Sequence, residues 1–539
     1  MKLNLFSLIL SLLVATSAQA ERVIVIMKDS QTFQAANMAY RTKGSGALKT
    51  GKAVATPVDA EIEQSLEHLN TLIVDAKNDT EIAKLQNDPA VAYVEKEVFH
   101  PAPLPVRGWL SVPVKNAPKV PGAKTPWGIL AVKAPEAWNK SNQGQGARVL
   151  VLDTGIDKEH PSLKANFEQG KDFTGESDGS DFSDKIGHGS HCAGTIAGVL
   201  DNNGFTGVAP QAKLLAGRVC SENGCSNAAI AAGVNWGIAQ KVDVISMSLG
   251  GAWSTPGERD AIAKAAKAGL TVVAASGNDG SARVSYPAAL PTVIAVGAID
   301  NTLKKTDFSQ YGPELAIVAP GAAVVSSVPQ GTGRESSVKI ATGGKQAPVN
   351  STTFQGAREV LTAETNVLVD AGLGKDTDFA GKDFKGKYAL IGRGEINFSV
   401  KIQNAIKAGA VGAVIYNNAP GLIQGALTSD GSVLPVAVFM IEQEVGKKIV
   451  ETLTAGKEVK ATLQTVATDY AAFDGTSMAT PHVAGVAALV KAANKNLNGA
   501  QVKQILTSTA TALGPNNNNE YGAGVVNAEA AVQAALSAK

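Results

Sequence analysis

Four apolar runs dominate the chain between residues 147 and 299, and they read ARVLVLDTG, VDVISMSLGG, GLTVVAASGN and PTVIAVGAI. They are rich in Val, Ile and Leu, and they lack the alternation of apolar and polar residues that is typical of a strand with one solvent-exposed face. Stretches of small residues with helical character, such as residues 258–269, separate them. Unbroken apolar strands with helices between them predict a parallel sheet covered on both faces. The predicted fold class is therefore α/β.

Other patterns flank and interrupt this region. Residues 21–100 begin and end with an apolar strand around a helical middle, which predicts a small α+β module. A Pro-rich segment follows at residues 101–124, which excludes a regular helix or a central strand and predicts a site of proteolysis. Residues 331–465 form a β-rich insertion, so the main domain comprises residues 125–330 and 466–539.

The first twenty residues have the pattern of a secretory signal peptide. Lys2 precedes an apolar stretch, and small residues lead to a cleavage point after Ala20. The alternative is a membrane anchor, but the apolar stretch is short and interrupted by polar residues. We therefore expect an exported protein that is not held in a membrane, located in the periplasm or in the medium.

Composition narrows the class of partner and the redox environment. The 539 residues include 49 basic and 48 acidic side chains, which gives no reason to expect nucleic acid or an anionic membrane as main partner. The three cysteines are Cys192, Cys220 and Cys225. In an oxidising compartment, Cys220 and Cys225 are expected to form a disulfide worth about 2 kcal/mol if unstrained. Cys192 lies among small apolar residues and is expected to be a buried, unreactive thiol.

Ser477, in the stretch GTSMATPH, is either a helix cap or a nucleophile. A serine nucleophile needs a base, and the base needs an orienting carboxylate. Of six histidines, His188 is the best placed, because it opens a helix after glycine. His482 follows Ser477 by about 500° of helix rotation and faces elsewhere.

Asp153 ends a predicted strand, where it could orient the base or simply form a turn. The tripeptide DTG also occurs in aspartic proteases, which need two such aspartates, and the sequence has no second copy. Asn278 and the backbone N–H of Ser477 could stabilise a developing oxyanion. All of these groups fall at strand ends or helix starts, where parallel-sheet proteins place their active groups.

Four segments, VLDTGID, GHGSHCAGTIAG, AASGN and GTSMATPHVAGVAALV, resemble the signature segments of the subtilisin-like serine proteases. The resemblance implies that Asp153 orients His188, that His188 is the general base, that Ser477 attacks, and that Asn278 donates to the oxyanion. It implies hydrolysis of peptide bonds through an acyl-enzyme, with no cofactor needed for the chemistry. By the same resemblance, Ser248, Leu249, Gly250 and Gly251 form the strand edge along which substrate backbone pairs. Ala274, Ala275 and Ser276 resemble a wall of the pocket for the residue before the cut, and their small size implies broad specificity.

The same resemblance suggests a structural calcium ion held by Asp201 and Asn203. Many members of the family have an aspartate ligand where this chain has Ser162, which weakens that site. Cys192 resembles the free cysteine beneath the histidine in the proteinase K-like branch.

The insertion resembles a protease-associated (PA) domain, with Ile396 where many copies have a cysteine. Its role there is either substrate access and protein binding or that of a passive lid. Residues 21–100 resemble an inhibitory propeptide, which assists folding and blocks the active site until the linker is cut.

The sequence therefore predicts a secreted, monomeric serine endopeptidase, made as a self-processing zymogen, that acts on protein or peptide substrates. Its own propeptide would be an intramolecular inhibitor. Two alternatives remain open at this point: a non-catalytic binding protein that keeps the fold as a scaffold, and an esterase that uses the same three residues.

Overall fold

A computed structural model describes residues 21–43, 61–107, 125–200, 205–423, 425–428 and 432–538. The predicted signal peptide (1–20) and most of the Pro-rich segment (108–124) lie outside the described residues. The chain divides into two compact units, Met1–Val98 and Phe99–Lys539. No helix within the described residues is long and apolar enough to cross a membrane.

The N-terminal unit is a four-stranded antiparallel sheet with two helices. The strand order is β2-β3-β1-β4. One apolar cluster joins the sheet to both helices, because Phe33 of α1 and Leu85 of α2 pack with Val23 and Val25 of β1. The unit is therefore α+β, as predicted. Its elements are β1 (Glu21–Met27), α1 (Ser30–Lys43), β2 (Glu61–Leu66), β3 (Thr71–Ala76), α2 (Asp79–Gln86) and β4 (Val91–Lys96).

The larger unit contains a seven-stranded sheet in the order β15-β14-β13-β12-β7-β9-β8, with every neighbouring pair parallel. All six residues of β14 are buried, and so are five of the six in β7. The strands are β7 (Arg148–Asp153), β8 (Phe167–Asp172), β9 (Lys213–Arg218), β12 (Val244–Met247), β13 (Thr271–Ala275), β14 (Ile294–Ile299) and β15 (Ile317–Pro320).

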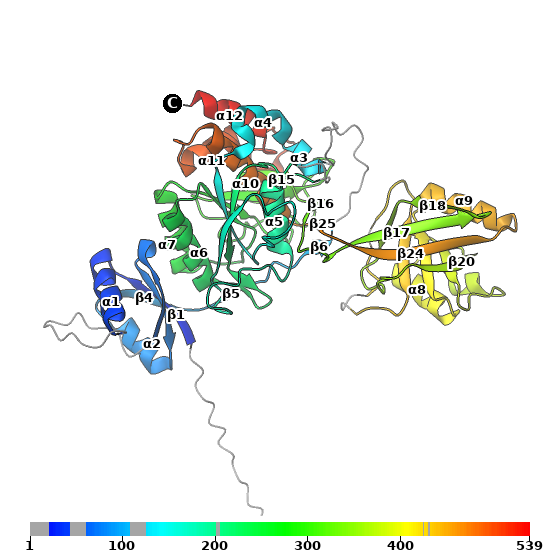
Figure 1. The fold of residues 1–539 in the computed structure, drawn as a ribbon, viewed down its shortest axis with the longest axis horizontal. Helices are drawn as coiled ribbons and strands as arrows, with labels where there is room; N and C mark the ends of the chain where they lie inside the picture. Colours follow the sequence, from blue (N-terminus) through cyan, green and yellow to red (C-terminus); the bar gives the residue numbers. More distant parts are fainter. Residues whose placement is uncertain are drawn as a thin grey trace, which may run out of the picture. The chain divides into compact units, whose positions relative to one another are not determined.

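Helices cover both faces of this sheet, which confirms the predicted α/β fold. Val149 and Val151 face a cluster built with α4, α5, α10, α11 and α12. Leu150 and Leu152 point the other way, against Gly237 and Gly233 of α6. Figure 1 shows α6 and α7 side by side. The helices are α3 (Trp127–Ala131), α4 (Ala134–Ser141), α5 (His188–Ala197), α6 (Asn227–Gln240), α7 (Pro256–Lys267), α10 (Thr476–Ala493), α11 (Gly499–Ser508) and α12 (Ala528–Ser537).

The insertion has its own eight-stranded sheet, in the order β18-β17-β24-β20-β21-β22-β23-β19. The insertion is joined to the rest of the chain by β17 and β24, which pair antiparallel along their whole length, with Gly333 opposite Thr468 at one end (Figure 1). Helix α8 packs on the face with Ile391, and α9 packs on the face with Leu390. Its elements are β17 (Gly333–Thr342), β18 (Lys345–Val349), β19 (Ser351–Thr353), β20 (Glu364–Asp370), β21 (Tyr388–Gly392), α8 (Phe398–Lys407), β22 (Gly412–Tyr416), β23 (Ala437–Ile441), α9 (Gln443–Thr454) and β24 (Val459–Thr468).

Two small sheets complete the larger unit. The first, β10-β11-β5, joins Cys220–Ser221, Gly224–Ser226 and Phe99–His100. The second, β16-β25-β6, joins Val324–Ser327, Tyr470–Asp474 and Val106–Arg107. Residues on both sides of the prolines at 101, 103 and 105 thus form edge strands, the one place in a sheet that tolerates proline. A disulfide joins Cys220 to Cys225 and confirms the predicted pairing.

Candidate active site

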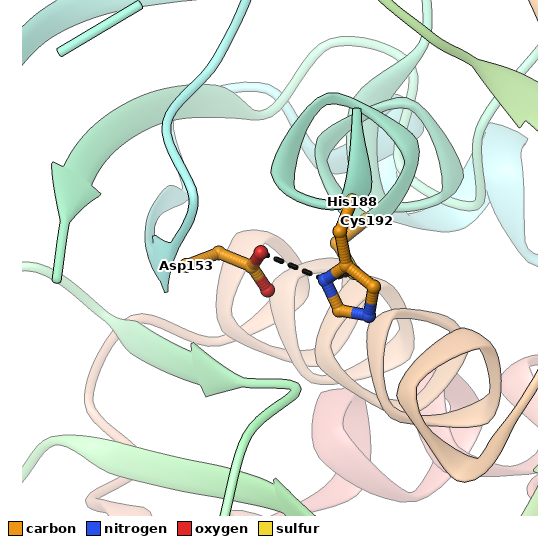
Figure 2. A group of neighbouring side chains, drawn as sticks. All are labelled: Asp153, His188 and Cys192. Atoms are coloured by element: carbon orange, nitrogen blue, oxygen red, sulfur yellow. Dashed lines mark hydrogen bonds and ion pairs between the residues drawn. The ribbon is translucent and has the colours of Figure 1, made fainter. Parts of the chain in front are cut away.

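The site begins at the carboxyl end of β7 and the first turn of α5. Asp153 is the last residue of β7, and His188 is the first of α5. His188 Nδ1 lies 2.7 Å from Asp153 Oδ1, as Figure 2 shows. The backbone N–H of Thr154 also donates to Oδ1, at 2.8 Å. The side chains of Asp153 and His188 are only 1% and 2% exposed, so the pair is shielded from water.

Burial and charge act in opposite directions on His188. Burial disfavours the charged imidazolium, but the charge of Asp153, the neighbouring Cys192 and hydrogen bonds to both outweigh burial and raise the pKa of His188 well above 6.5. His191, one turn along, has no carboxylate partner: burial lowers its pKa to about 3, and its Nε2 contacts the carbonyl of Val324 at 2.8 Å. Of the two histidines of α5, His188 is therefore the one paired with a carboxylate.

The cysteine that forms no disulfide, Cys192, lies next to this pair. Cys192 is fully buried, and its Sγ lies 3.9 Å from His188 Nδ1 and 3.5 Å from the carbonyl oxygen of Ser477. Burial raises the pKa of the thiol, so Cys192 is neutral at ordinary pH. It is a packing residue that contacts both sides of the site, as the sequence predicted for an unreactive thiol.

Ser477 is the second residue of α10, and α10 packs against α5. Its side chain is buried, with 9% of the residue exposed. In this conformation its hydroxyl donates to the carbonyl of Ser248 at 3.1 Å. The hydroxyl of Ser248 in turn donates to the carbonyl of Ser477 at 2.8 Å. These two hydrogen bonds fasten the start of α10 to the end of β12.

Asn278 lies on the loop after β13 with its amide oriented. Its Oδ1 accepts hydrogen bonds from the N–H and the hydroxyl of Thr476, both at 2.9 Å. Its Nδ2 therefore points to the other side, 3.7 Å from where a Cβ on Gly475 would stand. The backbone nitrogen of Ser477, in the first turn of α10, lies 3.5 Å from the same point, so the amide donor of Asn278 and this N–H are close together.

The predicted substrate-binding residues lie at the carboxyl ends of β12 and β13. Gly251 exchanges both backbone hydrogen bonds with Tyr286, at 2.9 and 2.8 Å. Ala274, Ala275 and Ser276 end β13 and are buried. The structure therefore brings the predicted residues to the carboxyl-terminal end of the parallel sheet.

The predicted calcium ligands cannot be compared with the structure. Asp201 and Asn203, the predicted calcium ligands, lie outside the described residues. Ser162 is buried with its hydroxyl 2.7 Å from the hydroxyl of Tyr470, so it offers no carboxylate. Among described side chains, Asp153, His188 and Cys192 alone form a group of three with ligand atoms close together, within 4.8 Å (Figure 2). Since His188 already pairs with Asp153 and the thiol is neutral, this group fits proton transfer.

Sequence reasoning missed two threonines that position the site. Thr154 donates its hydroxyl to Asp184 at 2.8 Å and accepts the N–H of Gly189 at 2.9 Å, which ties β7 to α5. Thr476 orients the amide of Asn278. Both threonines lie next to a predicted catalytic residue, within the segments that resemble the family signatures. No sequence pattern marks a threonine there as a residue that positions its neighbours.

Comparisons with known proteins agree with this geometry. The model of the subtilase family matches residues 144–356 and 444–524, and the model of the PA domain matches residues 360–449. The major intracellular serine protease of Bacillus subtilis is 44% identical over 213 residues, which cover 38% of this chain and 67% of that protein. Subtilisin NAT of Bacillus subtilis subsp. natto is 34% identical over 287 residues, covering 52% of this chain and 69% of that protein.

A solved structure is similar as well. The psychrophilic subtilisin-like protease Apa1 from the Antarctic psychrotroph Pseudoalteromonas sp. AS-11 matches with a TM-score of 0.59 and 29% identity, covering 77% of this chain and 99% of that one. The match includes the parallel-sheet architecture on which the site is built. The chain therefore belongs to the subtilase family, is a subtilisin-like serine protease, and carries an inserted PA domain.

Proposed function

We propose that this protein is a secreted serine endopeptidase of broad specificity, made as a self-processing zymogen, that cleaves peptide bonds through an acyl-enzyme on Ser477. The observation that carries the proposal is the buried Asp153–His188 pair at the start of α5, a helix that packs against α10, whose second residue is Ser477. A nucleophile, a base and an orienting carboxylate are the groups that acyl transfer by serine requires.

In the first step the hydroxyl of Ser477 leaves the carbonyl of Ser248 and turns to His188 Nε2. Catalytic hydrogen bonds of this kind are often unformed before substrate binds. Nε2 takes the proton as Oγ bonds to the substrate carbonyl carbon. Asp153 stabilises the imidazolium that results. His188 then gives the proton to the leaving amine as the C–N bond breaks, and water releases the acyl group by the same route.

The tetrahedral intermediate carries a negative oxygen that needs donors fixed in advance. We assign this role to Asn278 Nδ2 and the backbone N–H of Ser477. The assignment is supported by Thr476, which holds the amide oxygen of Asn278 and turns its nitrogen toward the site. Donors held in place cost no reorganisation when charge develops.

Substrate backbone is proposed to pair with Leu249 and Gly250 by strand addition. Specificity along Ala274–Ser276 is proposed to be broad, because small side chains exclude few substrates there. Protein and peptide chains are thus the substrates, and the enzyme acts as a monomer. If light scattering gives the mature enzyme the molecular mass of one processed chain, the monomer is supported. A mass of two processed chains would contradict it.

The N-terminal module of residues 21–98 is proposed to be the intramolecular inhibitor. Support comes from the segment that follows it. Phe99–His100 and Val106–Arg107 are paired as edge strands with β11 and β25 of the peptidase unit. Every peptide bond from His100 to Val106 has a proline on one side, and proline lacks the N–H that strand addition uses. This stretch would therefore resist cleavage while it occupies the site.

Export is proposed from the N-terminal pattern, and the Cys220–Cys225 disulfide suits an oxidising compartment. The chemistry is proposed to need no cofactor. A calcium ion held by Asp201 and Asn203 would be structural, and weakly held since Ser162 supplies no carboxylate. EDTA should then lower the Tm without changing turnover at low temperature, and an unchanged Tm would contradict the calcium ion.

The replacement Ser477→Ala tests the proposal. Expressed alone, the variant should fold but hydrolyse neither casein nor a peptide ester, and its N-terminus should remain at the residue after the signal peptide. N-terminal sequencing and intact mass would measure this. Normal maturation of purified Ser477→Ala would contradict self-processing. Wild-type turnover of esters with none of peptides would favour an esterase.

A further inference from the structure

His100 lies directly before the Pro-rich segment, and it is buried in the peptidase unit. Strand β5 pairs antiparallel with β11, with His100 opposite Cys225. Only 3% of His100 is exposed, whereas its neighbour Phe99 is 49% exposed. The segment thus turns its imidazole inward and leaves its larger apolar side chain in water. Burial of this polar ring in preference to the phenyl group calls for a specific partner.

That partner is Glu258, in the first turn of α7. His100 Nε2 lies 2.6 Å from Glu258 Oε1, and the two side chains are 2% and 4% exposed. The ring of Trp253 lies 5.4 Å from the imidazole, centroid to centroid. Gly251 completes the enclosure, because a Cβ there would stand 2.6 Å from His100 Nδ1. Gly251, Trp253 and Glu258 form what we call the imidazole site.

Glu258 is held in place by its own helix. Its Oε2 accepts hydrogen bonds from the N–H of Thr255 at 2.9 Å and the hydroxyl of Ser254 at 3.1 Å. The hydroxyl oxygen of Thr255 in turn accepts a hydrogen bond from the N–H of Glu258 at 3.2 Å, which completes a capping box. One carboxylate oxygen therefore serves the helix, and the other is aimed at the imidazole.

Short stretches of chain link the imidazole site to the proposed reaction centre. Gly251 is three residues after Ser248, whose carbonyl accepts the hydroxyl of Ser477. After His100 the chain continues to Val106, which pairs with Asp474, three residues before Ser477. The segment is thus paired with β11 at its start and with β25 at its end, and a substrate that binds by strand addition is expected to run the same way. His100 comes on the N-terminal side of that passage.

We propose that Gly251, Trp253 and Glu258 form a substrate subsite that selects an imidazole side chain on the N-terminal side of the cleaved bond. His100 fills this subsite before maturation. The inference rests on the proposed function, since it names a specificity of the same active site. The small residues at the end of β13 suggest broad specificity. This inference adds one substrate position at which the side chain must supply a hydrogen-bond donor.

The selectivity follows from burial. A leucine in the subsite would cover the carboxylate of Glu258 and leave Oε1 without a donor, which is costly for a buried charge. Sites built to pair with a polar group discriminate strongly against analogues that lack it. A lysine or arginine brings a donor, but the enclosure between Gly251 and Trp253 fits a flat ring of imidazole size.

The test uses mature enzyme and a set of otherwise identical peptides in which His or Leu is placed at each of several positions before the cleaved bond. At one position the wild type should prefer His over Leu by at least about tenfold in kcat/KM. In Glu258→Gln, which preserves the capping interaction, this preference should fall severalfold. In Glu258→Leu it should vanish or reverse.

Thr255→Ala is the matched control, because it removes the other half of the capping box without touching His100. It should lower stability and leave the His preference intact. Equal cleavage of His and Leu peptides at every position by wild type would overturn the inference while the proposed function stands. Loss of the preference in Thr255→Ala as much as in Glu258→Gln would assign Glu258 a structural role only. Failure to cleave any peptide would contradict the proposed function itself.

Discussion

The replacement Asp153→Asn tests how the buried pair works. It keeps the size of the side chain and an oxygen that can accept the N–H of Thr154, but it removes the charge 2.7 Å from His188 Nδ1. Both side chains are almost fully buried, so no water replaces the lost carboxylate. The variant should fold, and the effect should fall on the state in which His188 is charged.

The magnitude follows from the cost of an unpaired buried charge. Removing one partner of a buried ion pair costs about 3–5 kcal/mol. In the proposed reaction the imidazolium forms as Ser477 attacks, so this cost is added to the barrier. Each 1.36 kcal/mol is a factor of ten in rate, which predicts a loss of about 10²- to 10⁴-fold in kcat/KM.

The pH profile gives a second readout with a definite sign. His188 must be neutral to accept a proton, so activity rises as pH increases through its pKa. In the wild type Asp153 raises that pKa well above 6.5, which places the acid limb of kcat/KM above pH 6.5. In Asp153→Asn the largest opposition to burial is lost, so the acid limb should move to lower pH.

Hydrolysis of a chromogenic peptide from pH 5 to 10 measures both effects. Asp172→Asn is the matched control, since Asp172 is a buried carboxylate paired with Arg218 at 3.3 Å and not with His188. It should lower stability and leave the acid limb in place. A loss smaller than tenfold in Asp153→Asn, or an acid limb that stays or moves to higher pH, would refute the reasoning.

Three further predictions follow from other contacts. Replacing Cys220 and Cys225 together by serine should cost about 2 kcal/mol by chain entropy, seen as a lower Tm that reducing agent no longer affects; an unchanged Tm would contradict it. Gly128→Ala should destabilise by about 1–3 kcal/mol in thermal unfolding, although alanine favours helices, because its Cβ would stand 2.3 Å from His482 Nε2; equal or higher stability would show that His482 can move. N-terminal sequencing of the mature enzyme should place maturation after Arg107, and a start between residues 100 and 106 would contradict the resistance expected of proline-flanked bonds.

Much of the fold could be predicted from the sequence because its signals are local. Unbroken apolar runs indicated β7, β12, β13 and β14, and the structure places strands within each of them. Asp153 stood out because it ends such a run at a glycine turn. The Cys220–Cys225 pair needed only five residues of separation to be suspected.

The remainder depends on contacts between distant parts of the chain. His100 and Glu258 are 158 residues apart, and their meeting depends on a two-residue register between β5 and β11. No periodicity predicts so short a pairing, least of all in a Pro-rich segment. Glu258 did carry one local signal, the Thr255–Glu258 capping box, but that signal indicates a helix start and not a binding site.

The hydroxyl of Ser477 shows a similar limit. Its motif predicted that Ser477 stands at a helix N-terminus, and the structure places it there, with its hydroxyl hydrogen-bonded to the carbonyl of Ser248. Which acceptor a serine hydroxyl faces depends on a single side-chain torsion. Sequence patterns carry no information on that torsion, and substrate binding is expected to change it.

Covalent labelling tests the central claim most directly. Mature enzyme treated with a fluorophosphonate should gain one adduct, mapped by peptide mass spectrometry to Ser477, and His188→Ala should gain none under the same conditions. This outcome would establish Ser477 as a nucleophile activated by His188. Absence of an adduct from folded, processed enzyme, or an adduct on a different serine, would contradict the account.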